Sequence, residues 1–231
     1  MVEKRRITSR FTPPPAAEGA TPFFDTSLGR TVARRMPSNV GREVADLYGI
    51  ERDLGFVERF ADRLVALLAV PETNRDIDTI TAFQDAALIR YRRCFANGVR
   101  FRLTLEAVKQ VAPAGEEVHR HFFELANKNV AHSVNNKEIL EPMLLVYEAD
   151  GTKAGQGIYR MFGYQDTSDI TALKSLAVDL RDGYVIPRRN ILKKKFDQEC
   201  QDMDATAVAK LKPLIIPVGG MATASDIKRN K

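Results

Sequence analysis

The stretch Glu124–Asn136 (ELANKNVAHSVNN) holds the side chains of this chain that are best suited to chemistry. Its apolar residues have helical spacing, and it presents Asn127, Lys128 and His132 before it breaks on Ser-Val-Asn-Asn. A histidine titrates near neutral pH and can act as a general base, and a lysine one turn away on the same face can supply positive charge. Asn127, Lys128 and His132 are therefore the candidate catalytic residues.

Three interpretations of His132 stay open on the residues alone. The first is structural, because a histidine in the last turn of a helix interacts favourably with the negative end of the helix dipole. The second is catalysis of RNA cleavage, and the third is contact with RNA or a protein partner without catalysis. Ser133 and the two asparagines that follow can close the exposed carbonyls at the helix end, which suits the structural interpretation.

The other two histidines do not complete a metal site. His119 and His121 are two residues apart, so on a helix they point about 200° away from each other. His121 and His132 share a face, but at 1.5 Å rise per residue they lie about 16 Å apart. The sequence also lacks a phosphate-binding loop, a dinucleotide glycine motif and a nucleophile elbow. We therefore expect no metal and no cofactor.

The placement of basic residues permits contact with nucleic acid. The net charge is +5 and the isoelectric point is about 9.2, a mild excess that does not demonstrate such contact. In the run IRYRRCFANG, Arg92 and Arg93 point away from the apolar stripe that carries Tyr91. With Arg120 and His121 they form the predicted nucleic-acid-binding set. The alternative for these residues is a solvated helix face.

We expect a mainly α-helical fold, an up-down helical bundle with one β-hairpin insertion and disordered termini. The predicted ranges are a basic, proline-rich tail over 1–40, a helical domain over 41–205 with a hairpin near 142–165, and a flexible tail over 206–231. Apolar spacing and capping residues predict helices over about 42–68, 76–95, 116–133, 166–181 and 187–203, with a short helix near 104–110. The turn signal Asp150-Gly151 predicts the hairpin.

The sequence also favours a cytoplasmic protein. Its apolar runs are far shorter than the roughly 18 residues of a membrane span, so no membrane contact is expected. The basic N-terminus lacks the apolar core of a secretory signal. Cys94 and Cys200 form no disulfide framework, which suits a reducing compartment.

The segment ELANKNVAHS resembles the motif helix of the HEPN superfamily, whose members often have an arginine, a polar residue and then a histidine a few positions later. The likeness is to the abortive-infection branches (AbiU2-like and AbiV-like), with long helices before the motif. It covers Leu125, Asn127, Lys128, Ala131, His132 and Ser133. Ala126 stands in place of the arginine, so the motif is degenerate.

Active HEPN proteins are metal-independent ribonucleases whose arginine and histidine meet at a dimer interface. The resemblance therefore implies a homodimer that binds RNA or regulates a defence or toxin–antitoxin system, with an antitoxin or another protein as partner. It also implies a weak ribonuclease based on His132 if Lys128, Arg120 or Arg93 replaces the missing cation. The alternative is a non-enzymatic protein–protein interaction module with no nucleic-acid role.

Overall fold

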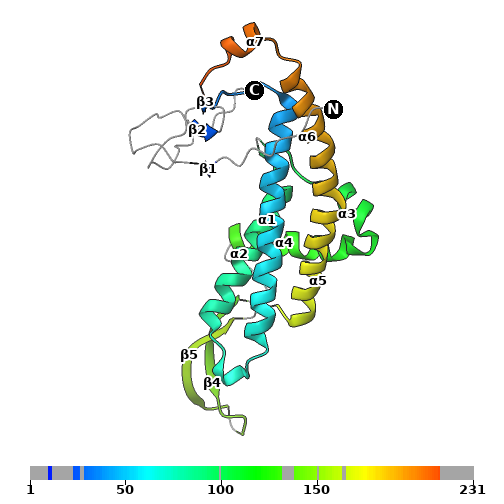
Figure 1. The fold of residues 1–231 in the computed structure, drawn as a ribbon. Coiled ribbons are helices and arrows are strands. Elements are labelled where there is room, and N and C mark those ends of the chain that lie inside the picture. The colour runs from blue at the N-terminus through cyan, green and yellow to red at the C-terminus, as the bar shows by residue number, and fades with distance from the viewer. Residues whose placement is uncertain are drawn as a thin grey trace. The chain divides into compact units, whose positions relative to one another are not determined.

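The computed structural model describes residues 10–11, 23–26, 29–98, 100–131, 138–149, 151–162 and 165–213. In these residues the chain is mainly α-helical with one long β-hairpin, which confirms the predicted fold class (Figure 1). The helices are α1 (Asn39–Leu68), α2 (Ile77–Phe95), α3 (Leu105–Val111), α4 (Glu116–Ala131), α5 (Thr167–Asp179), α6 (Ile186–Gln201) and α7 (Ala205–Lys210). The strands are β1 (Arg10–Phe11), β2 (Phe23–Thr26), β3 (Gly29–Val32), β4 (Glu138–Val146) and β5 (Lys153–Phe162).

The chain divides into two compact units. Unit 1 comprises residues 1–42 and 193–231, and unit 2 comprises residues 43–192. The predicted helical domain, 41–205, covers unit 2 and the adjoining parts of unit 1, and its bounds stay a prediction. Within unit 1, the hydroxyl of Ser38 donates to Glu199 Oε2 at 2.5 Å and also caps α1 by accepting from the Gly41 amide at 2.8 Å.

Gly41 allows helix α1 to approach the aromatic ring of Phe196 closely within unit 1. A Cβ atom at position 41 would lie only 2.6 Å from a carbon of that ring. Any larger residue would have to displace the phenyl ring or the helix. The glycine is therefore required by the packing of the first turn of α1.

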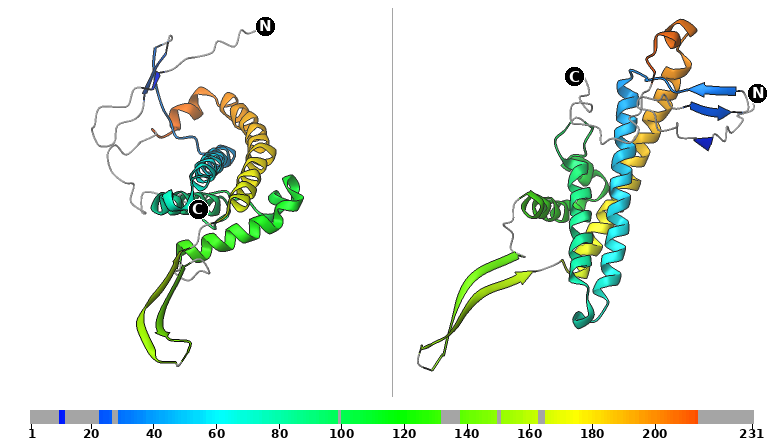
Figure 2. Two further views of the ribbon diagram at one scale, coloured as in Figure 1. Left: turned by 90° about the horizontal axis from the view of Figure 1, so that it is seen from below. Right: turned by 90° about the vertical axis from the view of Figure 1, so that its left-hand side faces the viewer.

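A single apolar core holds α1, α2, α3, α4 and α5 together in unit 2. Leu54, Leu88 and Phe122 are among its fully buried members, and they come from α1, α2 and α4 respectively. A smaller cluster at the other end of α1 includes Leu64 and Ile80. Figure 2 shows α1 and α2 running alongside each other, with α4 crossing them. Apolar residues at spacings of three and four along each helix supply these faces.

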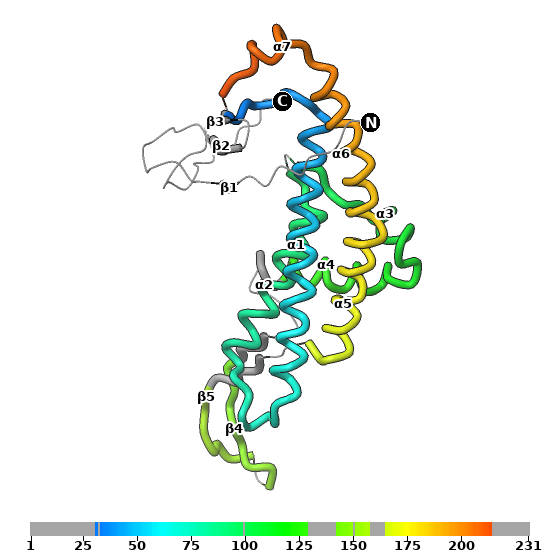
Figure 3. The backbone as a smooth tube through the Cα atoms, viewed as in Figure 1, coloured from blue at the N-terminus to red at the C-terminus, as the bar shows by residue number. Residues whose placement is uncertain are grey.

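Figure 3 shows α5 continuing into α6 without a break, and the two are joined by a π-helical turn, η3 (Leu180–Val185). The sequence predicted two separate helices with Pro187 at the start of the second. The structure keeps Pro187 in the first turn of α6, and the amide of Ile186 bonds to the carbonyl of Arg181. The wider turn accommodates a residue that lacks an amide hydrogen, because the ordinary i to i−4 bond is already replaced there.

The hairpin of β4 and β5 is antiparallel, with Met143 opposite Gly157 and Leu145 opposite Gly155. The register shifts by one residue between Leu145 and Val146. The right-hand view of Figure 2 shows the two strands extending away from the helices of unit 2. All described side chains of residues 142–149 are exposed. The hairpin lies where the sequence predicted it.

Two short segments of regular structure lie in the ranges predicted to be tails. Strands β1, β2 and β3 form an antiparallel sheet in the range expected to be disordered, and α7 falls in the range expected to be a flexible tail. The aromatic and β-branched residues in FFDT and GRTV favour strands. Asp204 caps α7 by accepting from the Ala207 amide at 2.7 Å. Residues 1–9, 12–22 and 214–231 lie outside the described part.

Candidate nucleic-acid interface

The run from Arg90 to Arg102, called here the arginine segment, spans the end of α2 and the following loop. It contains five arginines and no acidic residue; the arginines are Arg90, Arg92, Arg93, Arg100 and Arg102. Guanidinium groups at this density repel one another unless carboxylates or a bound polyanion neutralise their charge or solvent screens it. The partners of these five side chains therefore decide what the segment can bind.

One buried carboxylate, Asp53 of α1, organises three of the arginines. Its Oδ1 atom is 2.8 Å from Arg90 Nη1, and its Oδ2 atom is 3.1 Å from Arg100 Nη2 and 3.7 Å from Arg93 Nε. The Asp53 side chain is completely buried, whereas the side chains of Arg90, Arg93 and Arg100 keep 30%, 46% and 24% of their exposure. Three cations thus share one anion and still present charge to solvent.

Backbone contacts fix the loop that carries Arg100. Arg100 Nη2 donates to the carbonyl of Arg93 at 2.8 Å, and the amide of Phe101 donates to Asp46 Oδ2 at the same distance. The amide of Leu103 bonds to the carbonyl of Cys94, also at 2.8 Å. The loop is therefore tied to both α1 and α2, which holds the arginines in a defined arrangement.

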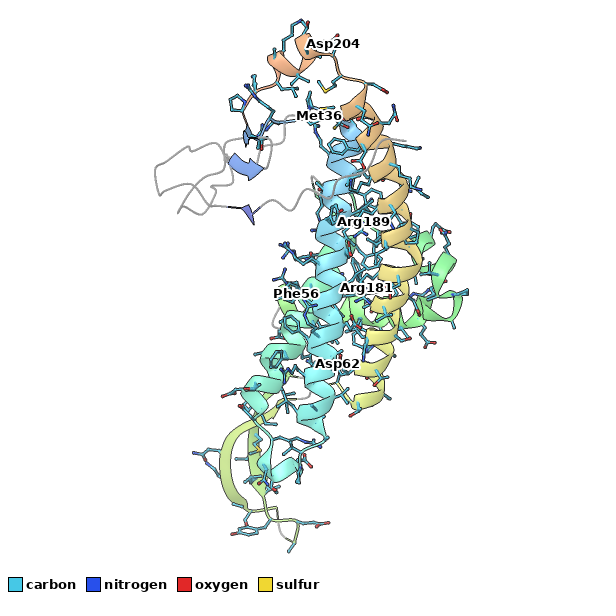
Figure 4. All side chains as sticks on the ribbon, viewed as in Figure 1. Met36, Phe56, Asp62, Arg181, Arg189 and Asp204 are labelled. Carbon is cyan, nitrogen blue, oxygen red and sulfur yellow. The ribbon has the colours of Figure 1, made fainter. Side chains whose placement is uncertain are left out.

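The ring of Phe56 on α1 joins the arginine segment to a further cation. The guanidinium carbon of Arg90 lies 4.7 Å from the ring centroid and that of Arg59 lies 4.5 Å from it. Such cation–π contacts are worth about 0.5–1 kcal/mol at exposed sites. Phe56 is labelled in Figure 4.

Arg92 and Arg93 face different helices although they are adjacent in the sequence. Arg92 Nε donates to Asn127 Oδ1 of α4 at 2.5 Å, whereas Arg93 approaches Asp53 of α1. The structure thus brings together two of the predicted site residues, Arg92 and Asn127. It separates Arg93, which the sequence offered as a substitute for the missing cation, from Asn127. Successive helical residues are about 100° apart, which explains the divergence.

Lys128 and Arg120 on α4 are each paired with an acidic residue one turn earlier. Lys128 Nζ lies 3.7 Å from Glu124 Oε2, and Arg120 Nη2 lies 2.8 Å from Glu116 Oε1. Both cations are well exposed, with 60% and 66% of their side-chain areas open to solvent. Exposed pairs of this spacing are weak, so a phosphate can compete for either cation.

The histidines of α4 have polar partners on neighbouring elements. His121 Nε2 lies 3.3 Å from Oε1 of the buried Gln165, whose Nε2 atom has no hydrogen-bond partner among the residues that the structure describes. His119 Nδ1 is 2.8 Å from the hydroxyl of Tyr91, and its ring contacts Phe95. Burial lowers the pKa of His119 below its ordinary value. These contacts give His119 a structural role.

Ala126, which replaces the arginine of the resembled motif, is completely buried in the core of unit 2. Its neighbour Asn127 faces Arg92 instead of the core. The arginine position therefore lies on the apolar face of α4. His132, the principal candidate of the sequence analysis, lies outside the described residues.

Cys94 is buried and burial, followed by the nearby charge of Asp53, raises its pKa to about 12. A thiol with such a pKa is not a nucleophile near neutral pH. Among the described residues, no three histidine, cysteine, aspartate or glutamate side chains gather as a metal-binding group would. No helix in this part of the chain is both long and apolar enough to cross a bilayer.

Sequence reasoning did not find Asp53, which is the centre of the arginine cluster. Its signal was present, because Asp53 lies three residues after Ile50 and four before Val57, both fully buried. A carboxylate on the apolar stripe of a helix must have a cationic partner if it is buried. The identity of that partner does not follow from local spacing, since the arginines are more than 35 residues away.

The chain has no significant match among protein-family models, among curated proteins or among solved structures.

Proposed function

We propose that this protein binds RNA through the arginine segment and the adjoining face of α4. The observation that supports the proposal is the charge balance of the segment. Asp53 is the one carboxylate that pairs with these five arginines in the described part of the chain, while Arg92 and Arg102 contact only the neutral amides of Asn127 and Asn97. Unneutralised arginines supply the phosphate contacts on which RNA affinity depends.

Arg92 is the residue best placed to supply the cation that the degenerate motif lacks. It comes from α2, its side chain is partly exposed, and it contacts Asn127, the polar residue of the motif. A guanidinium can bind a phosphate with two parallel hydrogen bonds, which a lysine cannot do. We extend the proposal to a HEPN-like homodimer with a regulatory role in a defence or toxin–antitoxin system, in which His132 adds a weak metal-independent ribonuclease activity.

Binding of a labelled single-stranded RNA to the full chain, in EDTA and at rising salt, tests the proposal. Arg92→Gln and Arg102→Gln are each expected to weaken binding and to reduce the slope of log K against log salt by about 0.7. Lys174→Gln on α5 is the matched control, because it also removes one exposed positive charge but lies outside the segment. The RNA affinity of this control should equal that of the wild type, once the concentration of folded protein has been measured by circular dichroism for both.

Cleavage is measured on the same samples. Products that form in EDTA and disappear in His132→Ala would establish the ribonuclease, and binding without cleavage would support the RNA-binding role alone. Absence of RNA binding at about 50 mM salt, where phosphate contacts are strong, would refute the proposal. An equal loss in Lys174→Gln would show that total charge, and not the arginine segment, controls binding.

The exposed hairpin favours a second candidate, a protein-interaction module that pairs with a second copy of this chain. Five consecutive apolar residues of the hairpin are 37–60% exposed: Met143, Leu144, Leu145, Val146 and Tyr147. Successive residues of a strand point to opposite faces, so both faces of the hairpin carry exposed apolar side chains that a second copy could cover. β4 and β5 pair only with each other in the described residues, and an isolated two-stranded hairpin is marginally stable in water.

The oligomeric state tests this second candidate. If the hairpins pair, the chain should be dimeric at micromolar concentration in sedimentation experiments, and Leu144→Lys with Val146→Lys should make it monomeric. A dimer that survives the double substitution would point instead to α4, which the sequence favoured as the interface. A wild-type monomer would refute the pairing of hairpins.

A further inference from the structure

A surface pocket of about 460 Å³ lies over α1 on the side that faces η3. It is lined by Tyr48, Glu51, Arg52, Gly55, Arg59 and Arg181. The five α1 residues recur at spacings of one, three and four, so they share one face of the helix. The volume is within the range of about 300–1,000 Å³ that small-molecule sites occupy.

Gly55 forms the floor of this pocket and brings two guanidinium groups close to the helix backbone. A Cβ atom at Gly55 would lie 3.4 Å from Arg59 Nη1 and 3.9 Å from Arg181 Nη1. The two cations therefore converge on one point, although one comes from α1 and the other from η3. A glycine inside a helix lowers stability relative to alanine. Gly55 therefore keeps the floor of the pocket open at the expense of helix stability.

Ion pairs orient some of the lining residues and leave others unneutralised. Arg181 bonds to Glu58 and, at 2.8 Å, to Asp182, which holds its guanidinium between α1 and η3 (Figure 4). Arg52 and Arg59 have no carboxylate partner within the described residues. The pocket therefore keeps an excess of positive charge that can accept an anion.

Positive charge also flanks the pocket beside Glu51. Glu51 is paired with Arg189 of α6, so its charge is compensated and does not repel an anion. The guanidinium of Arg189 also lies 4.7 Å from the ring centroid of Tyr48. Tyr48 is 47% exposed at the rim, which leaves part of its ring open for stacking. An exposed aromatic ring can stack against any nucleobase, because every base has a π-face.

We propose that this pocket binds a free nucleotide, with Arg52 and Arg59 on its polyphosphate and Tyr48 against its base. Two unneutralised guanidinium groups and an exposed aromatic ring match the two chemical parts of such a ligand. Planar guanidinium groups bind phosphate oxygens in pairs, and Arg181, held by Glu58 and Asp182, lines the site beside Arg59. This site uses none of the arginines of the arginine segment and does not depend on RNA binding.

Titration calorimetry of the full chain with ATP, inorganic pyrophosphate and adenosine tests the proposal. We expect ATP and pyrophosphate to bind and adenosine not to bind, because phosphate contacts supply most of the affinity. Arg52→Gln and Arg59→Gln should each weaken both anions about tenfold, the effect of losing one charge-assisted contact. Tyr48→Ala should lower the affinity for ATP to that for pyrophosphate and leave pyrophosphate binding unchanged.

Two further variants separate the site from general charge and from unfolding. Arg42→Gln removes an exposed arginine of the same helix outside the pocket and should bind ATP as the wild type does. Gly55→Ala places a methyl group on the pocket floor in ordinary contact distance, so it should fold at least as stably and yet bind pyrophosphate more weakly.

Failure of ATP and pyrophosphate to bind below about 1 mM would overturn the proposal. Equal losses in Arg42→Gln and Arg52→Gln would also overturn it, since they would reveal a general charge effect. RNA binding that is lost in both Arg52→Gln and Arg92→Gln, without any nucleotide binding, would assign the pocket to the RNA surface instead. Nucleotide binding that persists in Arg92→Gln would support a separate site, whatever the result with RNA.

Discussion

The substitution Asp53→Asn removes the negative charge that three arginines share and leaves the shape of the side chain almost unchanged. Asp53 is completely buried, and its oxygens lie 2.8 Å from Arg90 and 3.1 Å from Arg100. An asparagine in its place keeps one acceptor oxygen but turns an amide group toward the guanidinium groups. The substitution therefore converts three ion pairs into three cations without an anion.

The size of the effect follows from the burial of each partner. Removing one member of a buried ion pair costs about 3–5 kcal/mol, because the remaining charge is left uncompensated. Here the arginines that remain are 24–46% exposed and can recover some hydration. The loss should therefore lie at the lower end, about 3 kcal/mol of the free energy of unfolding.

Urea denaturation followed by circular dichroism measures this loss. With a urea dependence of about 3 kcal/mol/M, the midpoint should fall by about 1 M relative to the wild type. Asp62→Asn on the same helix is the matched control, because Asp62 is 55% exposed and pairs with the exposed Lys174. Its midpoint should move far less, since exposed pairs contribute little. A loss below about 1 kcal/mol for Asp53→Asn, or one equal to that of the control, would refute the role given to the buried carboxylate.

Three further predictions follow from the core of unit 2 and from the two thiols. The free energy of unfolding should fall as the pH drops below about 6.5, because burial holds the pKa of His119 below that ordinary value and the unfolded chain binds the proton more readily. His119→Phe should flatten this pH dependence in urea titrations between about pH 5 and 7.5. In native protein a thiol reagent should modify the exposed Cys200 and spare Cys94 until the chain unfolds, so Cys200→Ser should show no rapid reaction. Rapid modification of both thiols in the native wild type would contradict the burial of Cys94. Ala126→Arg should lower the free energy of unfolding by at least about 3 kcal/mol and give no gain in RNA cleavage over the wild type, whereas a stable variant that cleaves RNA faster than the wild type would show that α4 can present an arginine there.

Local patterns in the sequence were enough to predict helices α1 to α6, although not α7. Asp76 precedes an apolar run with helical spacing, and in the structure it caps α2 by accepting from the amide of Thr79 at 3.0 Å. Asp166 does the same for α5 through the amide of Asp169 at 2.8 Å. The hairpin was predictable because Asp150-Gly151 is a strong turn signal between two β-rich runs. In each case the determining residues lie within a few positions of one another.

The arrangement of the candidate site depends on contacts that local patterns do not contain. Arg92 and Arg93 both lie off the apolar stripe of α2, and spacing alone could not say that one faces Asn127 and the other Asp53. Those partners are 35 and 40 positions away in the sequence, and the packing of α2 between α1 and α4 selects them. The same packing places Ala126 in the core, which single-helix periodicity did not require.

The burial of Ala126 changes how the missing arginine should be understood. If an arginine stood at that position, its charge would have to enter the apolar core of unit 2, where an unpaired charge is very costly. The cations on α4 itself, Lys128 and Arg120, are each opposed by a glutamate one turn away. The arginine segment, in contrast, is paired with a single carboxylate, that of Asp53 on α1, and its Arg92 contacts the polar residue of the motif. Any phosphate that approaches this face therefore meets its strongest positive charge on α2, so a substitution at Arg92 should affect RNA binding more than one at Lys128.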